Sequence, residues 1–162
     1  MDWTTADLSD RFPEAPYLPG LLKDFGGRAR FFGRVRTLRV LEDNLLVRRV
    51  LEEGGEVLVI DGGGSLRTAL LGGNLARLAL ERGFRGVVVH GAVRDAAELR
   101  ALPLGVKALG TTPKKSAKAG VGEVDVPVEF LGLRVLPGQF LVADEDGLLL
   151  LPAPPSGGQS GG

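Results

Sequence analysis

The stretch from Gly72 to Asp95 constrains the fold of this chain more than any other segment. It predicts a glycine turn, a helix, a short strand and a pair of charged residues after the strand. Asn74 is a favourable helix N-cap, and Gly83 stands where a left-handed residue commonly ends a helix. The valine-rich run 86–89 is typical of a strand buried on both faces. The stretch therefore predicts one helix-strand unit of an α/β sheet.

Arg94 and Asp95 follow the predicted strand directly and form the first candidate site. Open α/β sheets bind their ligands beyond the carboxyl ends of the strands, so a cation and an acid are well placed here. If Gly72 and Gly73 lie at the same end, the free amides of the helix start would form a cradle for an anion. In the alternative interpretation, the two charges form an ion pair, or Asp95 caps a helix over 96–102.

Composition limits the possible chemistry. The chain has 162 residues, enough for one domain with a sizeable core, and its formal net charge is zero. Direct nucleic-acid or membrane binding is therefore not expected. The absence of cysteine excludes disulfides and thiolate sites, and His90 is the only histidine. With no apolar run long enough to span a membrane and no secretory signal at the start, a cytoplasmic protein is expected.

The amino-terminal part predicts a helix capped by Thr4 or Thr5 that ends before Pro13, and then a strand within 28–41. That strand region carries the densest positive charge of the chain, namely Arg28, Arg30, Arg34, Arg36 and Arg39. Two interpretations stay open. The arginines form a solvated strand face, or they form a patch for RNA or an acidic partner.

A helix capped by Asp43 or Asn44 and a buried strand over 56–60 follow. The glycine-rich segment 61–65 lacks the third glycine of a dinucleotide fingerprint, because Arg67 stands at that position, and it lacks the lysine of a P-loop. It therefore predicts a tight turn.

The basic segment 111–120 is unpatterned, which predicts a flexible loop, with a lid as its functional alternative; none of its lysines is assigned to the site. Alternating strands and turns from 123 to 151 predict antiparallel hairpins, with the acids at 144–146 as exposed turn formers. The predicted class is α/β, with mixed sheets and a β-rich carboxyl-terminal part. The Pro/Gly/Ser-rich tail 153–162 is expected to be disordered.

Several segments taken together resemble the RraA-like family, which includes regulators of ribonuclease E activity and 4-hydroxy-4-methyl-2-oxoglutarate aldolases. They are 25–29, 59–65, 91–95, 122–126, 137–138 and 143–147. The resemblance covers 1–152 as a single domain. It implies a swivelling β/β/α fold and a homotrimer with sites between subunits.

The resemblance also implies a function and its residues. If this chain resembles the aldolase members, Arg94 would bind the 2-oxo acid. Asp95 would hold a divalent metal cation, Mg or Mn, largely through water. The backbone of Gly72, Gly73, Asn74 and Leu75 would bind the pyruvate carboxylate. The implied activity is cleavage of 4-hydroxy-4-methyl-2-oxoglutarate, or of a related 4-hydroxy-2-oxo acid, to pyruvate. Oxaloacetate decarboxylation is implied as a side activity.

The family offers a second, non-catalytic function. Its regulators inhibit ribonuclease E-type RNA processing by binding protein, so ribonuclease E or an RNA helicase is the alternative partner. The presence of Asp95 favours the enzyme, because some regulators carry a neutral residue there. His90 is predicted to pack near the pocket, and no residue is assigned as the general base.

Overall fold

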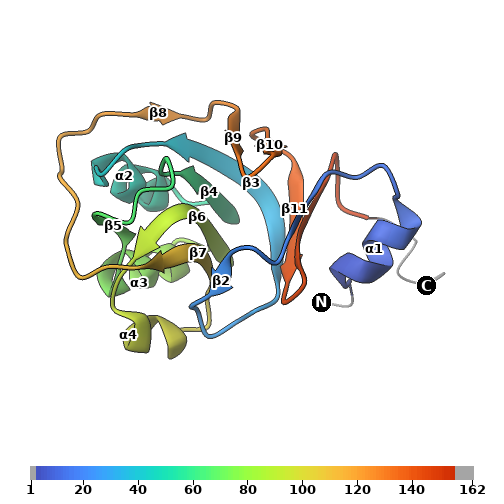
Figure 1. Cartoon of the computed structure of the whole chain (residues 1–162), viewed down its shortest axis with the longest axis horizontal. Helices are drawn as coiled ribbons and strands as arrows, with labels where there is room; N and C mark the ends of the chain where they lie inside the picture. Colours follow the sequence, from blue (N-terminus) through green and yellow to red (C-terminus); the bar gives the residue numbers. More distant parts are fainter. Residues whose placement is uncertain (1–2, 156–162) are drawn as a thin grey trace.

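Strand β3 (Phe31–Arg39) joins the two halves of the fold. In the computed structural model, which describes residues 3–155, its first part pairs antiparallel with β11 (Phe140–Asp144). Its second part pairs parallel with β4 (Val57–Asp61). A ten-stranded sheet results (Figure 1). Eight strands follow the order β1 (Tyr17–Pro19), β12 (Gly147–Leu151), β11, β3, β4, β6 (Gly86–Val93), β7 (Gly105–Thr111) and β2 (Lys23–Asp24), while β5 (Ala69–Leu71) pairs with β6 and β8 (Glu123–Val124) pairs with β3. Most of the tail predicted to be disordered, over 156–162, lies outside the described residues.

The remaining elements confirm the predicted α/β class and its β-rich carboxyl-terminal part. The helices are α1 (Thr5–Arg11), α2 (Leu45–Glu53), α3 (Gly73–Glu81) and α4 (Ala96–Arg100). The remaining strands are β9 (Val128–Phe130) and β10 (Leu133–Val135). Antiparallel hairpins form as predicted in this part, as the pairs β9/β10 and β11/β12. The expected turn at Pro137-Gly138 does not join a hairpin, because β10 pairs with β9 and not with β11.

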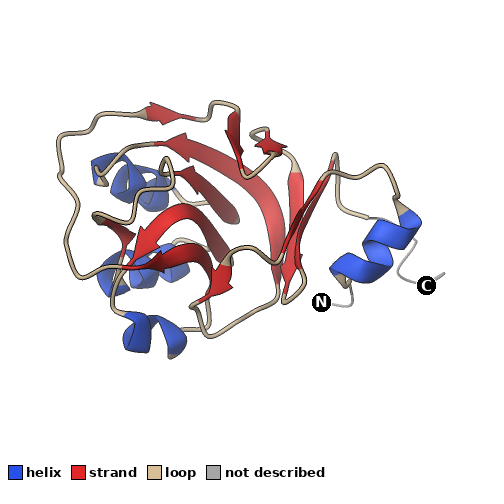
Figure 2. Cartoon of the chain, in the orientation of Figure 1, coloured by secondary structure: helices blue, strands red, loops and turns tan. Residues whose placement is uncertain are grey.

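The central strands are buried on both faces because successive side chains enter different cores. Leu58 and Ile60 of β4 pack in the cluster that includes the apolar faces of α2 and α3. Val57 and Val59 pack in a second cluster with residues of β9 to β12. Figures 1 and 2 show α2 and α3 together on one side of the sheet, whereas α1 lies apart, against β12 and β11. Charged side chains are thereby found mainly at the strand ends and on the outer surface, with the buried Lys107 of β7 as an exception.

Phe31 closes the amino-terminal end of the parallel strands. A Cβ atom added to Gly86 or Gly105 would lie 2.1 Å from the Phe31 ring, so the ring rests directly on the first residues of β6 and β7. Phe32 points to the opposite face, where its ring meets Trp3 and Phe140 edge-on or tilted. This alternation agrees with the expectation for adjacent strand residues.

The buried Lys107 of β7 ties distant parts of the sheet together. Its Nζ donates to Asp24 Oδ1 of β2 at 2.9 Å and to the Asp144 carbonyl oxygen at the end of β11 at 2.7 Å. A buried ammonium group is costly unless it is paired and hydrogen-bonded, and these two acceptors meet that requirement. The sequence analysis did not predict this contact.

The acidic turn at 144–146 corrects one expectation. Glu145 and Asp146 are exposed, but Asp144 is buried and accepts hydrogen bonds from Thr5 N at 2.8 Å and Thr5 Oγ1 at 2.7 Å. Burial alone would raise the pKa of Asp144, but the bonds from Thr5 and from Asp146 N outweigh it, and the pKa lies below its usual value. Asp144 thus anchors the start of α1, whose predicted cap Thr4 is confirmed.

The helix boundaries bring a second correction. Helix α3 begins one residue before Asn74, with Gly72 in the N-cap position, so the predicted Asn74 cap is wrong. The expected left-handed end at Gly83 is confirmed, with φ of 93°. Helix α4 is shorter than expected and ends at Arg100. Among residues 3–155, no helix has the length and apolarity that a membrane crossing requires.

The arginines along β3 form a solvated, ion-paired face. Arg36 pairs with Glu53 and Asp125 at 2.7 and 2.9 Å, and Arg39 pairs with Glu123 at 2.6 Å. These contacts bear out the solvated interpretation for the strand itself. Arg28 and Arg30 precede the strand and have different surroundings.

Replacing Gly86 with alanine is expected to lower the free energy of unfolding by about 1–3 kcal/mol, because the added methyl group overlaps the Phe31 ring. The matched control is Gly110→Ala in β7, where the nearest atom to the new Cβ belongs to the Leu66 side chain at 3.6 Å. That change should stay within about 0.5 kcal/mol. Urea-induced unfolding measures the free energy of unfolding of both variants. Equal losses would contradict the close packing of the Phe31 ring on Gly86.

Asp144→Asn is expected to cost about 1–3 kcal/mol of unfolding free energy at neutral pH, because it weakens a buried set of hydrogen bonds. A carboxyl with a depressed folded-state pKa stabilises the fold above its unfolded pKa, and this contribution disappears as pH falls through the folded value. The difference between wild type and variant should therefore shrink as pH falls below about 4. Urea titrations at several pH values test this, and a pH-independent difference would refute it.

Candidate functional site

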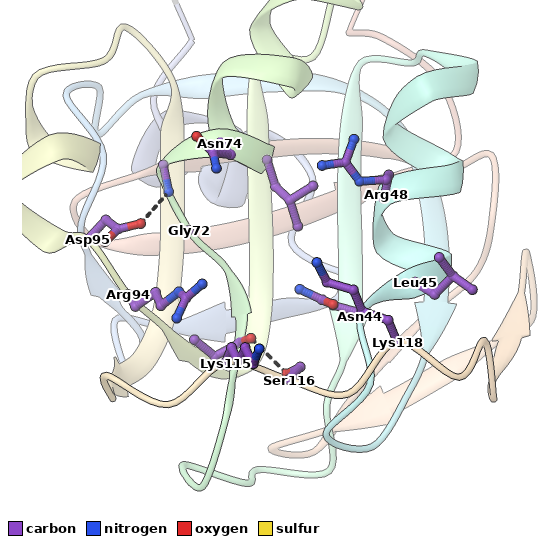
Figure 3. Close-up of a pocket in the computed structure, with 13 residues that line it drawn as sticks. Asn44, Leu45, Arg48, Gly72, Asn74, Arg94, Asp95, Lys115, Ser116 and Lys118 are labelled. Atoms are coloured by element: carbon purple, nitrogen blue, oxygen red, sulfur yellow. Dashed lines mark hydrogen bonds between the residues drawn. The ribbon is translucent and has the colours of Figure 1, made fainter.

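A pocket opens at the carboxyl-terminal end of the parallel strands, between the starts of α2 and α3 and the end of β6 (Figure 3). It brings together all six residues selected from the sequence, namely Gly72, Gly73, Asn74, Leu75, Arg94 and Asp95. Asn44, Leu45, Arg48, Ala69, Lys115, Ser116 and Lys118 complete the lining. The order of the sheet explains this convergence, because β5 pairs parallel with β6, so α3 begins beside the end of β6.

Asp95 bridges two helices. It occupies the N-cap position of α4 in a left-handed conformation, with φ of 62°, but its side chain makes no capping bond to α4. Its Oδ2 instead accepts from Gly73 N, the first amide of α3, at 2.9 Å. The alternative in which Asp95 only caps its own helix therefore does not hold. Gly72 permits the approach, because a Cβ atom there would lie 2.9 Å from Asp95 Oδ2.

The start of α3 retains two amides for a ligand. The first four N–H groups of a helix have no partner within it, and here Asp95 engages the amide of Gly73. The next two amides, of Asn74 and Leu75, belong to residues that line the pocket. Since the helix dipole adds positive potential at this end, the start of α3 favours an anion such as a carboxylate.

Arg94 faces this helix start from the end of β6. Its Nη1 donates to the carbonyl oxygen of Pro113 at 3.3 Å, which fixes the side chain and leaves other guanidinium N–H groups for a ligand. In Figure 3 the guanidinium groups of Arg94 and Arg48 point toward each other from opposite sides of the pocket. The pocket therefore offers two separated cationic groups.

The segment 111–120 corrects a third expectation, because hydrogen bonds hold it along the pocket wall instead of leaving it as a flexible loop. Ala69 N donates to the carbonyl oxygen of Lys114 at 2.8 Å, and the buried Ser116 donates through Oγ to the carbonyl oxygen of Ala69 at 2.7 Å. Lys115 and Lys118 are thereby placed on the lining. The sequence analysis missed both lysines, since their positions depend on backbone pairing between distant segments.

Asp43 holds the far end of that segment. Its carboxylate accepts from Ala119 N at 2.7 Å, from Gly120 N at 3.1 Å and from Leu45 N, the first amide of α2, at 3.2 Å. Burial would raise the pKa of Asp43, but these amides outweigh it and lower the pKa below its usual value. The predicted role of Asp43 at the start of the helix is thus combined with an unpredicted role in fixing the wall.

His90 lies outside the pocket lining. Its ring stacks on Phe130 with centroids 4.9 Å apart, and its Nδ1 is 3.5 Å from Asp61 Oδ1. The glycine-rich segment after Asp61 forms the predicted turn, with positive φ at Gly63 and Gly64. His90 is therefore a packing residue, as expected, but not one beside the candidate site.

The donor set at Asp95 is suited to a hard cation. Its Oδ1 has no hydrogen-bond partner among residues 3–155, and the side chain is exposed. No group of three or more His, Cys, Asp or Glu side chains is close enough to hold a metal within the described part of the chain. One carboxylate oxygen with open surroundings fits Mg²⁺ or Mn²⁺, which retain several waters, and does not fit a tetrahedral zinc site.

Comparisons of the sequence and of the fold with known proteins agree on one family. The family described as Aldolase/RraA matches residues 5–150. A 4-hydroxy-4-methyl-2-oxoglutarate aldolase from Thermus thermophilus is 71% identical over 164 residues, covering 100% of both chains. The structure of the RNA-processing inhibitor RraA from the same species is 70% identical, with a TM-score of 0.94 over 97% of each chain.

A third relative carries a different name on the same fold. The structure of an S-adenosylmethionine: 2-dimethylmenaquinone methyltransferase from Geobacillus kaustophilus is 48% identical, with a TM-score of 0.87 over 93% of this chain and 95% of that one. Sequence and fold thus agree across nearly the whole length, although the names of the relatives differ. On this basis the chain belongs to the RraA-like family.

Proposed function

We propose that this protein is a divalent-metal-dependent aldolase that cleaves 4-hydroxy-4-methyl-2-oxoglutarate, or a related 4-hydroxy-2-oxo acid, to pyruvate. The observation that carries the proposal is the convergence of Arg94, Asp95 and the start of α3 on one pocket. The 71% identity to a Thermus thermophilus protein named for this activity supports it.

Substrate binding follows from the anion-directed groups. The carboxylate next to the ketone would lie against the amides of Asn74 and Leu75, with the Arg94 guanidinium donating to the carboxylate and the keto oxygen. Such fixed donors orient the substrate before reaction and lower the entropic part of the barrier. Because Gly72 and Gly73 have no side chains, the carboxylates of Asp95 and Glu98 can lie against this helix start.

Asp95 would hold the Mg²⁺ or Mn²⁺ ion through its free Oδ1, while the Gly73 amide keeps the carboxylate oriented. When bound, the ion supplies a Lewis acid for the keto oxygen. In the cleavage, water takes the proton of the 4-hydroxyl, and the C4–O bond becomes a carbonyl as the bond between C3 and C4 breaks. The electron pair of the broken bond forms an enolate with the ketone, and water then protonates C3 to give pyruvate. Arg94 stabilises the negative charge that develops on the keto oxygen.

The basic wall accounts for the second carboxylate of this substrate. Arg48, Lys115 and Lys118 line the pocket together with Arg94, whereas Asp95 is the only acid among the described residues of the lining. The excess of positive charge suits a dianion. Oxaloacetate, also a 2-oxo dicarboxylate, would lose carbon dioxide by the same movement of electrons toward the ketone, so we propose its decarboxylation as a side activity.

The alternative function is that of a non-catalytic, protein-binding inhibitor of ribonuclease E-type RNA processing, with ribonuclease E or an RNA helicase as partner. It is supported by the 70% identity to a structure described as an RNA-processing inhibitor. For either function we propose a homotrimer. The exposed apolar side chains of Leu41, Leu66 and Val121 are candidates for subunit contacts.

Asp95→Asn is expected to reduce pyruvate release from 4-hydroxy-4-methyl-2-oxoglutarate at least about a hundredfold, because the charge that would hold the cation is removed. Asparagine can still accept from the Gly73 amide, so the helix start should persist. A coupled pyruvate assay measures the rate, and Mn²⁺ electron paramagnetic resonance measures ion binding independently.

The matched control is Asp146→Asn, which removes a carboxylate from an exposed turn away from the pocket. This variant should retain both activity and Mn²⁺ binding. Unchanged activity in Asp95→Asn would refute the assigned role. Wild-type protein that binds Mn²⁺ but releases no pyruvate would favour the inhibitor function.

Lys118→Met is expected to raise KM about tenfold for 4-hydroxy-4-methyl-2-oxoglutarate, since a charge-assisted contact to the second carboxylate is lost. The KM for 4-hydroxy-2-oxopentanoate, which lacks that carboxylate, should hardly change. Lys114→Met is the control, because Lys114 is exposed but does not line the pocket. Equal effects on both substrates would exclude the proposed contact.

A further inference from the structure

A second cleft lies at the opposite, amino-terminal end of the parallel strands. Its rim carries three arginines, Arg28, Arg30 and Arg85, and the rings of Phe31, Phe32 and Phe84 line it. Pro103, ahead of β7, completes the lining, which contains no acidic residue, and the cavity measures about 310 Å³. We call it the arginine cleft. It includes Arg28 and Arg30, the part of the basic sequence stretch that the strand face does not use.

The three guanidinium groups are available to a ligand. All three arginines are exposed, and the Arg28 side chain has no hydrogen-bond or ion-pair partner among residues 3–155. Arg30 is 3.4 Å from Glu145 and Arg85 is 3.6 Å from Glu56, contacts that are solvated and long. Exposed pairs of this kind contribute little to stability, so a better carboxylate ligand can replace them. Arg85 Nη1 also donates to the carbonyl oxygen of Phe32 at 3.4 Å, which leaves its other N–H groups for a ligand.

The backbone that carries these arginines is fixed in advance. Gly26 and Gly27 lie against the carbonyl oxygens of Leu104 and Leu102, where a Cβ atom would come within 2.0 and 2.3 Å. Arg28 N then donates to the Leu104 carbonyl oxygen at 3.3 Å. On the floor, Phe31 is wedged over the first residues of β6 and β7. A preorganised site loses less entropy on binding than a mobile one.

We propose that the arginine cleft docks a short acidic segment of a protein partner, with separate carboxylates paired to the three arginines. Guanidinium groups bind carboxylates through two parallel hydrogen bonds. The three arginines come from two segments that meet at the amino-terminal end of the parallel strands. Apolar side chains between the acids would contact the exposed Pro103. The site is an interaction surface distinct from the pocket at the other end of the strands.

The surroundings favour an acidic peptide over RNA. Phe31 and Phe84 are buried, and the Arg85 guanidinium covers Phe32 with its centre 5.0 Å from the ring centroid, so no ring is open for base stacking. The net charge of zero offers no long-range attraction to a polyanion.

The test uses fluorescence anisotropy of the full chain with a short fluorescein-labelled peptide of alternating glutamate and alanine. Saturable binding is expected at low salt, and Arg28→Gln combined with Arg85→Gln should weaken it at least about tenfold. The control pair Arg49→Gln and Arg134→Gln removes the same charge from exposed positions outside the cleft and should change it less than about twofold. Circular dichroism verifies that both double variants are folded.

An unlabelled oligouridylate of equal charge should fail to displace the peptide. No saturable binding to the wild type, or equal weakening in the two double variants, would overturn the proposal. Displacement by oligouridylate would assign the cleft to RNA instead. Pyruvate release should stay the same in both double variants, so the outcome is independent of the aldolase assignment.

Discussion

The whole structure depends on burying both faces of β4, β6 and β7. Their consecutive apolar residues, such as Val57–Ile60, leave no face for water, so each side needs its own cover. Helices α2 and α3 cover one face, and strands β9 to β12 cover the other. Charged side chains can then approach the sheet mainly at the strand ends. The candidate active site lies at the carboxyl-terminal end of the parallel strands, and the arginine cleft lies at their amino-terminal end.

Glycines allow the close contacts from which both ends are built. At the carboxyl end, Gly72 lets the Asp95 carboxylate reach the first amide of α3. At the amino end, Gly86 and Gly105 accommodate the Phe31 ring. In each case a side chain from a distant segment takes the space of a missing Cβ atom, which couples local sequence to the tertiary arrangement.

Membership of the RraA-like family does not by itself decide between the two functions. Relatives at 70% and 71% identity carry the names of an inhibitor and of an aldolase, so fold alone does not choose between them. The pocket does supply a physical distinction, because it combines a carboxylate, a guanidinium group and a helix start. An inhibitor that acts through its outer surface would need none of these groups in one hollow. The arrangement therefore favours chemistry on a small anion.

By itself, the sequence determined the α/β class and the buried strands, which follow from local patterns, since periodicity and turn residues act over a few positions. It also singled out Gly72, Gly73, Arg94 and Asp95, and the family resemblance added Asn74 and Leu75 as candidates. Only the tertiary structure decided that Asp95 binds Gly73 N instead of capping α4, and that Asp144 is buried under Thr5. It also placed Lys115 and Lys118 on the wall of the pocket. Such contacts join segments far apart in the chain, so their partners become defined only when the sheet closes.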